Sequence, residues 1–409
     1  MGADHSHGQS APGSRRAIQV TLAVIIPLAL ATLAALIWMW PAAPKPADDV
    51  GNSLIKVNGT ITYITSKPCP EQVGEARSCD TALVQLTSGR LPDQNVSAEI
   101  PGGRGSPKFE VGDDVTLIYT PGDPLGQGQD SYQLSDHDRS SPMWLVGAAF
   151  VLAVIAFGRL RGLMALVGLV VTFALLLLFL IPAILAGEPP LLVAIVCAAA
   201  IMLSVLYLTH GFTLPTSIAV IGTLASLTLT GVLAVTAIAL THLNGITDDS
   251  SLYLDLNYEI NTQGLLLASI IIGSLGVLDD VIVTQAVTVS ELAHANPSFS
   301  PWQLYRAAAR VGRAHIASVI NTIILAYSGS ALPLLLLFSI GNQPLGEVLT
   351  GPVVAQEIVR SVAGTLGLIA AVPITTALSA LTATRRSSVL AFGPESTGEQ
   401  VTPTFVKDD

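Results

Sequence analysis

The sequence predicts an α-helical polytopic membrane protein with about eight transmembrane helices and one small extracytoplasmic β-rich domain. Hydrophobic residues make up 51% of the chain and charged residues only 12%, far from the composition of an average soluble domain. A bilayer core of about 30 Å needs roughly 20 apolar residues in a helix. Eight apolar stretches meet or approach that length: residues 18–40, 143–158, 162–186, 191–208, 213–240, 264–284, 315–340 and 361–384.

The loops between these stretches alternate in charge. One side collects Arg15, Arg16, Arg159, Arg161, Arg306, Arg310, Arg313, Arg385 and Arg386. The other side collects Glu188, Asp248, Asp249, Asp255, Glu259, Glu347 and Glu357. Short cytoplasmic loops are enriched in Lys and Arg, so this pattern predicts a protein of the bacterial cytoplasmic membrane with both termini in the cytoplasm.

The same pattern divides the chain into segments. Residues 1–17 and 385–409 are predicted to be disordered cytoplasmic tails, and residues 18–40 form a retained signal-anchor helix, longer than the core of a typical cleaved signal. Residues 41–141 lie outside, and residues 142–384 form a seven-helix membrane domain. The net charge of −10 excludes nucleic acid as a partner, because no basic face is available to replace counterions on phosphate.

The outward segment carries five short alternating runs separated by Gly, Pro, Asn and Asp clusters. These runs are residues 54–65, 82–86, 96–100, 115–120 and 131–134. They predict a small closed or sandwich-like β unit, with an OB-type barrel as one form. Cys69 and Cys79 are expected to form a disulfide in an oxidising compartment, since a metal site would need further ligands nearby. The role expected of this domain is to bind an envelope protein or a wall component.

The sixth apolar stretch contains the clearest pattern of polar and small residues within a predicted span. Helical periodicity places Ser269, Gly273, Gly276, Asp280, Thr284 and Glu291 on one face. We expect this face to point into the bundle, because small residues permit close helix packing and an ionisable group inside a membrane avoids lipid. Asp279 is rotated by about 100° from Asp280, and Gln285 follows Thr284 directly.

The seventh stretch supplies polar side chains at a matching depth. Ser318 and Asn321 share a face there, and Asn321 is about 9 Å from the cytoplasmic end at 1.5 Å per residue. Carboxylates beside an amide and hydroxyls predict a proton or cation site near the cytoplasmic end of the sixth helix. The alternative is a structural role for Asp279 and Asp280, as an interhelical hydrogen-bond clamp or as side chains that reach cytoplasmic water.

Three further features concern the path and its surroundings. Pro333 and Pro373 indicate discontinuous helices, because a break frees backbone groups that neighbours or a water-filled cavity must satisfy. Glu357 and Arg360 lie one turn apart and could pair, either as a gate or as ordinary packing. Residues 301–314 predict a separate amphipathic helix that lies on the inner leaflet.

Several of these segments together resemble the YibE/F-like family of bacterial multi-pass membrane proteins. The segments are residues 276–281, 284–285, 315–329 with His315, Asn321 and Tyr327, 332–337, 357–360 and 372–376. The resemblance covers residues 51–384 and excludes both tails. It implies the multi-pass architecture and no particular reaction.

Three functions remain open from the sequence. The first is a permease or exporter of unknown substrate, coupled to protons or cations through Asp280 with Asp279 and Asn321. The second is a non-catalytic envelope scaffold or accessory subunit that acts through the β domain. The third is a membrane-embedded transferase, since residues 278–280 resemble the metal-binding aspartates of polyprenyl-phosphate sugar transferases, but the further carboxylates that Mg²⁺ and a diphosphate need are missing. No cofactor is expected, and ATP-driven action would need a separate ATPase subunit.

Overall fold

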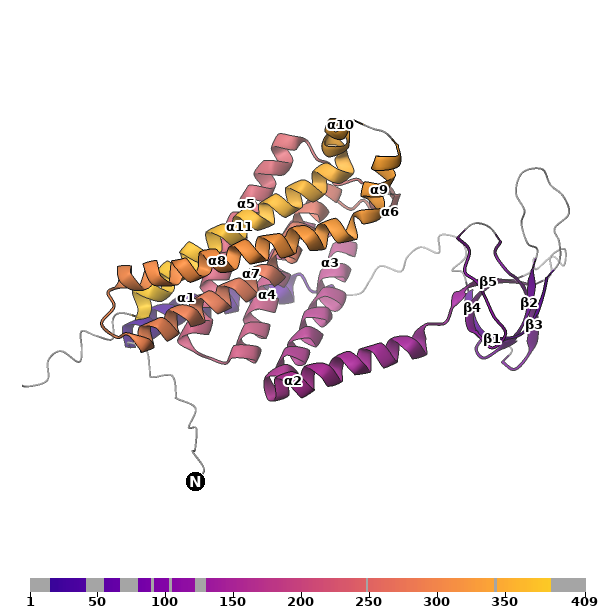
Figure 1. Cartoon of the computed structure of the whole chain (residues 1–409), viewed down its shortest axis with the longest axis horizontal. Helices are drawn as coiled ribbons and strands as arrows, with labels where there is room; N and C mark the ends of the chain where they lie inside the picture. The colour runs from indigo at the N-terminus through magenta and orange to yellow at the C-terminus, as the bar shows by residue number, and fades with distance from the viewer. Residues whose placement is uncertain are drawn as a thin grey trace, which may run out of the picture. The chain divides into compact units, whose positions relative to one another are not determined.

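The computed structural model describes residues 15–41, 55–66, 80–89, 92–102, 105–121, 130–247, 249–341 and 344–383. The chain divides into two compact units, Lys45–Leu163 on one hand and Met1–Pro44 with Met164–Asp409 on the other. The first unit contains a β-barrel and the start of a long helix, and the second is a bundle of helices (Figure 1). Cys69, Cys79 and the predicted tail 385–409 lie outside the described residues.

The barrel confirms all five predicted strands. They are β1 (Ile55–Thr65), β2 (Thr81–Leu86), β3 (Asn95–Glu99), β4 (Asp114–Thr120) and β5 (Ser131–His137). The strands close in the order β1-β2-β3-β5-β4, which agrees with the predicted small OB-type barrel. β1 pairs antiparallel with both β2 and β4, and β3 pairs parallel with β5. A register shift between Ile61 and Tyr63 bends β1 so that it can serve both neighbours.

The barrel core follows from alternation along the strands. On β2, Ala82, Val84 and Leu86 are buried while the residues between them are not. Val115 and Leu117 on β4 are fully buried and meet them in the same hydrophobic cluster. This is the pattern of a sheet that buries one face away from water.

The helices of the described chain include several that are long and mostly apolar. In chain order, the helices are α1 (Arg15–Trp38), α2 (Ser140–Leu175), the π-helical turn η1 (Leu176–Leu180), α3 (Ile181–Leu185), α4 (Pro190–His210), α5 (Leu214–Thr241), α6 (Asp249–Tyr258), α7 (Thr262–Ala295), α8 (Pro301–Ser330), α9 (Leu332–Ile340), α10 (Leu345–Thr350) and α11 (Pro352–Ala383). Six stretches among the described residues are long and apolar enough to cross a membrane: Ile18–Trp38, Ser140–Leu185, Pro190–His210, Leu214–Thr241, Thr262–Ala295 and Pro352–Ala383. This supports a multi-pass membrane protein.

The longest of these stretches contains two of the predicted spans. Arg159 has φ 50° and ψ −130°, values outside any helix, and it divides α2 at the boundary between residues 143–158 and 162–186. Gly162 is required next to this kink, because a Cβ there would overlap the carbonyl oxygen of Val154. The predicted seventh span, residues 315–340, is not among the six apolar stretches.

The two predicted helix breaks have different outcomes. α8 ends at Ser330 and α9 begins at Leu332, with Pro333 in its first turn, so the predicted break at Pro333 is confirmed. The break predicted at Pro373 is wrong, because α11 continues through this residue. The Pro373 ring lies on the exposed side of α11, where neighbouring helices do not constrain it.

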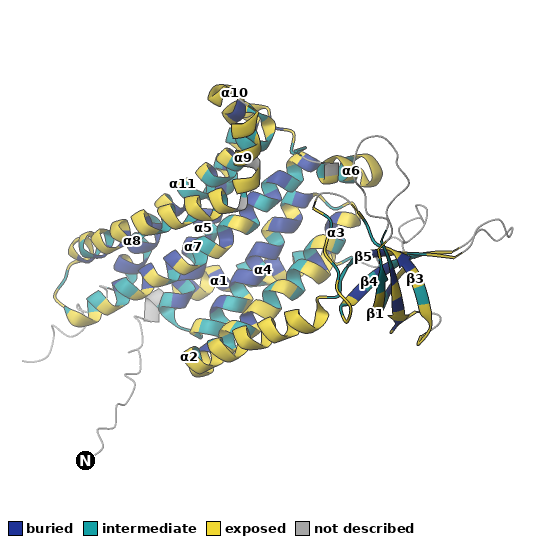
Figure 2. Cartoon of the chain, turned by 45° about the vertical axis from the view of Figure 1, so that its right-hand side comes forward, coloured by how far each residue is buried: buried dark blue, intermediate teal, exposed yellow. Residues whose placement is uncertain are grey.

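The separate surface helix predicted for residues 301–314 is also wrong. These residues form the first half of the continuous helix α8, which begins with a capping box at Ser300 and Gln303. Leu304 and Ala308 are fully buried against Val289 of α7 and Ala380 of α11. Figure 2 shows the buried positions concentrated on α4, α5 and α7, whereas α9 and α10 are mostly exposed.

We predict that Gly162→Ala lowers the stability of the full-length protein by roughly 1–3 kcal/mol, the usual cost of overpacking, because the new methyl group meets a backbone carbonyl that cannot move aside. Thermal unfolding in detergent measures the effect. Gly158→Ala is the matched control, since nothing lies within 4 Å of a Cβ at that position, and it should be neutral or slightly stabilising. Equal melting temperatures for the two variants would contradict the kink at Arg159.

Candidate functional site

Three helices meet closely in the centre of the helical unit because small residues face hydroxyl groups. A Cβ at Gly222 of α5 would lie 2.6 Å from Oγ1 of Thr375 on α11. A Cβ at Gly367 of α11 would overlap the hydroxyl of Thr230 on α5. A third close approach joins α11 to α7. Such contacts between small residues hold helices together in membranes.

The third approach lies beside a cavity of about 310 Å³ between α7, α8 and α11. A Cβ at Gly364 of α11 would lie 3.0 Å from Oγ of Ser274 on α7, and both residues line this cavity. The full lining is Gly273, Ser274, Val277, Leu278, Ile323, Ala326, Tyr327, Arg360, Ser361, Gly364, Thr365 and Leu368. Its size is at the lower end of the range for small-molecule sites.

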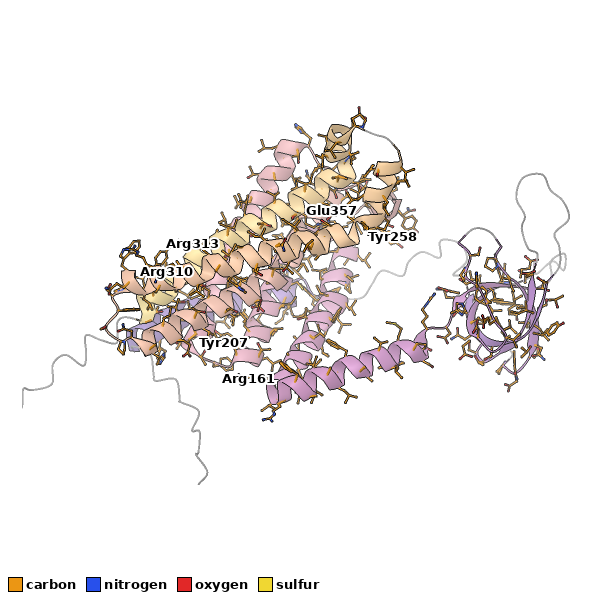
Figure 3. All side chains as sticks on the ribbon, in the orientation of Figure 1. Arg161, Tyr207, Tyr258, Arg310, Arg313 and Glu357 are labelled. Carbon is orange, nitrogen blue, oxygen red and sulfur yellow. The ribbon has the colours of Figure 1, made fainter. Side chains whose placement is uncertain are left out.

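The predicted pair of Glu357 and Arg360 is confirmed, and Arg360 lines the cavity. Arg360 Nη1 donates to Oε1 of Glu357 over 2.9 Å. The Arg360 side chain is 27% exposed and that of Glu357 is 37% exposed, so the pair contributes little to stability by itself. In Figure 3, Glu357 lies toward one end of the helical unit, whereas Arg310 and Arg313 lie toward the other.

The most unusual feature of α11 is a series of buried polar atoms without hydrogen-bond partners among the described residues. These atoms are Gln356 Nε2, Arg360 Nε, Thr375 Oγ1 and Ser379 Oγ. At 100° per residue they fall within an arc of about 140° on α11. From Gln356 to Ser379 the helix rises by about 35 Å, as long as a bilayer core is thick.

Sequence reasoning missed Gln356, Thr375 and Ser379 as members of a site. The signal was present as polar or small residues that recur every three or four positions along α11, at 356, 360, 364, 367, 371, 375 and 379. An unpaired buried polar group costs free energy that water or a ligand normally offsets. The stripe therefore marks the part of the bundle with unmet hydrogen-bonding capacity.

Gln285, a predicted site residue, lies near the Ser379 end of this stripe and holds helices together there. Its Nε2 donates to the carbonyl oxygen of Ala308 on α8 over 3.1 Å and to Oγ1 of Thr376 on α11 over 2.7 Å. Gly312 of α8 leaves room for the amide, because a Cβ there would lie 2.7 Å from Gln285 Oε1. Gln285 is buried and joins three helices at one point.

The orientation predicted for the Asp280 face is wrong. The face of α7 that points into the bundle carries Leu275, Leu278, Ile282 and Val289, all buried. The opposite face is exposed at Gly276, Asp280, Thr284 and Glu291. Gly273 belongs to the same face, but it lies near Tyr327 of α8 and lines the cavity. The physical reason is that lipid is as apolar as a protein core, so apolar side chains do not reveal which face of a helix is inside.

Asp279 takes the position that had been expected for Asp280. It is half-buried, and its Oδ1 is buried with no hydrogen-bond partner among the described residues. Ser318 and Asn321 on α8 are exposed. The structure therefore does not gather the predicted residues into one cluster. Asp279 is the carboxylate among the described residues that has a buried oxygen without a hydrogen-bond partner.

A wider, open basin of about 740 Å³ lies where α5 ends, around α6, and where α7 begins. His242, Asp255 and Glu259 line it, and both His242 and Glu259 have positive φ, at 53° and 52°. Among the described residues, no three His, Cys, Asp or Glu side chains converge as a metal ion would require. The basin lies at the α11 end that carries Gln356, since Ile238 and Leu243 also pack with Val359 of α11.

Comparison with known proteins gives one match. The model of the family described as YibE/F-like protein matches residues 146–385, more than half of the chain and all of α4 to α11. No curated protein and no solved structure matches the chain. The matched region contains Asp279, the cavity and the polar stripe of α11, but not the barrel.

We predict that Gln285→Leu destabilises the protein by roughly 1 kcal/mol, because the Ala308 carbonyl loses the amide donor. The midpoint of thermal unfolding in detergent measures this. Gln263→Leu is the matched control, since the Gln263 side chain is exposed and donates only to the Leu243 carbonyl. If Gln263→Leu were as harmful as Gln285→Leu, the junction of three helices would not matter for stability.

Proposed function

The chain belongs to the YibE/F-like family, and from that premise we propose that it is a membrane permease or exporter whose substrate path follows α11. The observation that supports this proposal is the stripe of unpaired buried polar atoms from Gln356 to Ser379. Polar groups inside a membrane protein normally pair with one another or line a water-filled or substrate-filled path. A stripe about 35 Å long is sufficient to cross the bilayer core.

The contrast with α5 strengthens the proposal. The buried hydroxyls of Thr223, Ser226 and Thr230 on α5 all donate to carbonyl oxygens of their own helix. Those of Thr375 and Ser379 on α11 have no such partner. Hydroxyls that are satisfied locally, including that of Thr376 on α11, need nothing else. The hydroxyls of Thr375 and Ser379 retain donors for water or substrate.

The path would be closed in the conformation described here. Between Arg360 and Thr375 the stripe runs past Gly364 and Gly367, which pack directly against Ser274 and Thr230. Movement of α11 away from α5 and α7 would open this segment. We expect the basin lined by His242 and Glu259 to be one mouth of the path.

Asp279 is our candidate for proton or cation coupling, in place of Asp280. A buried carboxylate oxygen without a partner binds a proton or a cation more readily than one that is solvated. Asp280 follows Asp279 directly, but its side chain is exposed rather than buried.

We also propose eight membrane crossings, with residues 41–141 outside and both termini in the cytoplasm. The stretch Ser140–Leu185 has 46 residues, about 69 Å of helix at 1.5 Å per residue, so the kink at Arg159 would separate two crossings. α8 with α9 would supply one more. The arginines near the kink and at the start of α8 would then face the cytoplasm.

Reporter fusions test this topology. We expect fluorescent-protein fusions at residues 10 and 400 to be active in the cytoplasm, and an alkaline phosphatase fusion at residue 100 to be active outside. A fusion at residue 400 that is active only on the opposite side from residue 10 would exclude an even number of crossings.

A second candidate function is that of an envelope scaffold or accessory subunit. The closed five-stranded barrel favours it, since such barrels commonly present a binding surface. In this case the barrel would hold an envelope protein or a wall component, and the carboxylates of α7 would serve packing only.

We predict that Asp279→Asn abolishes the transport phenotype, whereas the adjacent Asp280→Asn leaves it largely intact. Metabolite and lipid profiles of a deletion strain, complemented with each variant at matched expression, measure the phenotype. Full complementation by Asp279→Asn would remove the coupling mechanism. If it were combined with loss of function on deletion of residues 52–138, the scaffold would be favoured over the permease.

A further inference from the structure

The cavity between α7, α8 and α11 is polar at one end and apolar at the other. The hydrogen bonds and contacts above show that α7 and α11 run in the same direction, since Ser274 meets Gly364 and Gln285 meets Thr376. α8 runs the opposite way, since Gly273 of α7 lies near the hydroxyl of Tyr327 whereas Gln285 of α7 contacts Ala308.

All three helices contribute to the same gradient along this common axis. The end toward the start of α11 is lined by Arg360, Ser361, Ser274 and Tyr327, with Thr365 one turn further on. The opposite end is lined by Val277, Leu278, Ile323 and Leu368. From Arg360 to Leu368 the gradient extends over about 12 Å.

The guanidinium of Arg360 supplies the charged group at the polar end. Among the described residues that line the cavity, Arg360 is the one with a charge, and none is a carboxylate. Glu357 lies outside the lining and engages only Nη1. Arg360 Nε is buried and has no acceptor among the described residues. A guanidinium in this state favours a carboxylate or phosphate oxygen, for which its planar array of donors is suited.

From this geometry we propose that the cavity binds an amphipathic anion, with a carboxylate or phosphate head on Arg360 and an apolar chain along Leu278, Ile323 and Leu368. The hydroxyls of Ser274, Ser361 and Thr365 would donate further hydrogen bonds to the head. The ligand is either a free amphiphile or an acidic lipid of the bilayer, because both present this chemistry. The inference deepens the proposed permease function by naming its substrate class, and it concerns binding, which is measured without transport.

The test uses the full-length protein in nanodiscs of phosphatidylcholine and the fluorescent probe 11-(dansylamino)undecanoic acid. We expect the probe to bind with increased emission and to be displaced by lauric acid or lauryl phosphate, but not by dodecanol, which has the same chain without the charge. Arg360→Gln should weaken binding tenfold or more, since a hydrogen bond to a charged group is lost. Arg310→Gln is the matched control, because Arg310 is exposed on α8 and lies outside the cavity, and it should bind normally.

A second variant tests the site independently, in case Arg360→Gln misfolds. Ala326→Trp fills the cavity from α8 without changing any charge, and it should also abolish binding while the melting temperature stays near that of the wild type. Equal displacement by dodecanol and lauric acid would overturn the proposal, as would unchanged binding by both variants.

The source of the ligand is decided by a parallel measurement. The protein is purified from membranes that contain phosphatidylglycerol, and retained lipid is counted by native mass spectrometry. Retention that is lost in Arg360→Gln and kept in Arg310→Gln supports a bilayer lipid as the ligand, and probe binding without such retention supports a free amphiphile. Absence of both overturns the site, whereas binding without any change in cellular profiles on deletion would count against transport alone.

Discussion

The helical unit depends on the close approach of α5, α7 and α11 through glycine–hydroxyl contacts. Gly222 against Thr375 and Gly367 against Thr230 leave no space for a larger side chain, and Gly364 packs closely on Ser274. Helices in lipid lack the hydrophobic force that drives packing in water, so close van der Waals contact between small residues takes its place. These contacts bring polar groups of three helices into the centre of the bundle, and the cavity and the polar stripe follow from that arrangement.

The barrel is organised by a different force. Val84, Val115 and Leu117 are withdrawn from water in a closed sheet, and this burial is what stabilises a small β domain. The two units of this chain are therefore stabilised by different interactions, because one folds in water and the other packs in lipid. The hydrophobic pattern of the strands reveals their inward face, whereas the same kind of pattern is uninformative for a helix in lipid.

The distinction explains which predictions about the site were correct. Glu357 and Arg360 pair as expected because their spacing on one helix determines their distance. The face of α7 that carries Asp280 was predicted to point into the bundle, on the assumption that small and polar residues point inward. This face is exposed at Asp280. Asn321 and Ser318 were matched to the aspartates by depth alone, and depth does not determine the direction of a side chain.

The sequence by itself determined the apolar stretches, the five strands of the barrel, the break at Pro333 and the family, because each depends on residues that are close together in the chain. Only the tertiary structure decided that α11 carries a series of unpaired buried polar atoms, that Asp279 rather than Asp280 is partly enclosed, and that the helix after Ser300 joins the bundle. These features depend on which helices are neighbours. Helices in a membrane pack where their shapes and small residues match. The spacing of residues within one helix does not show which other helix provides the match.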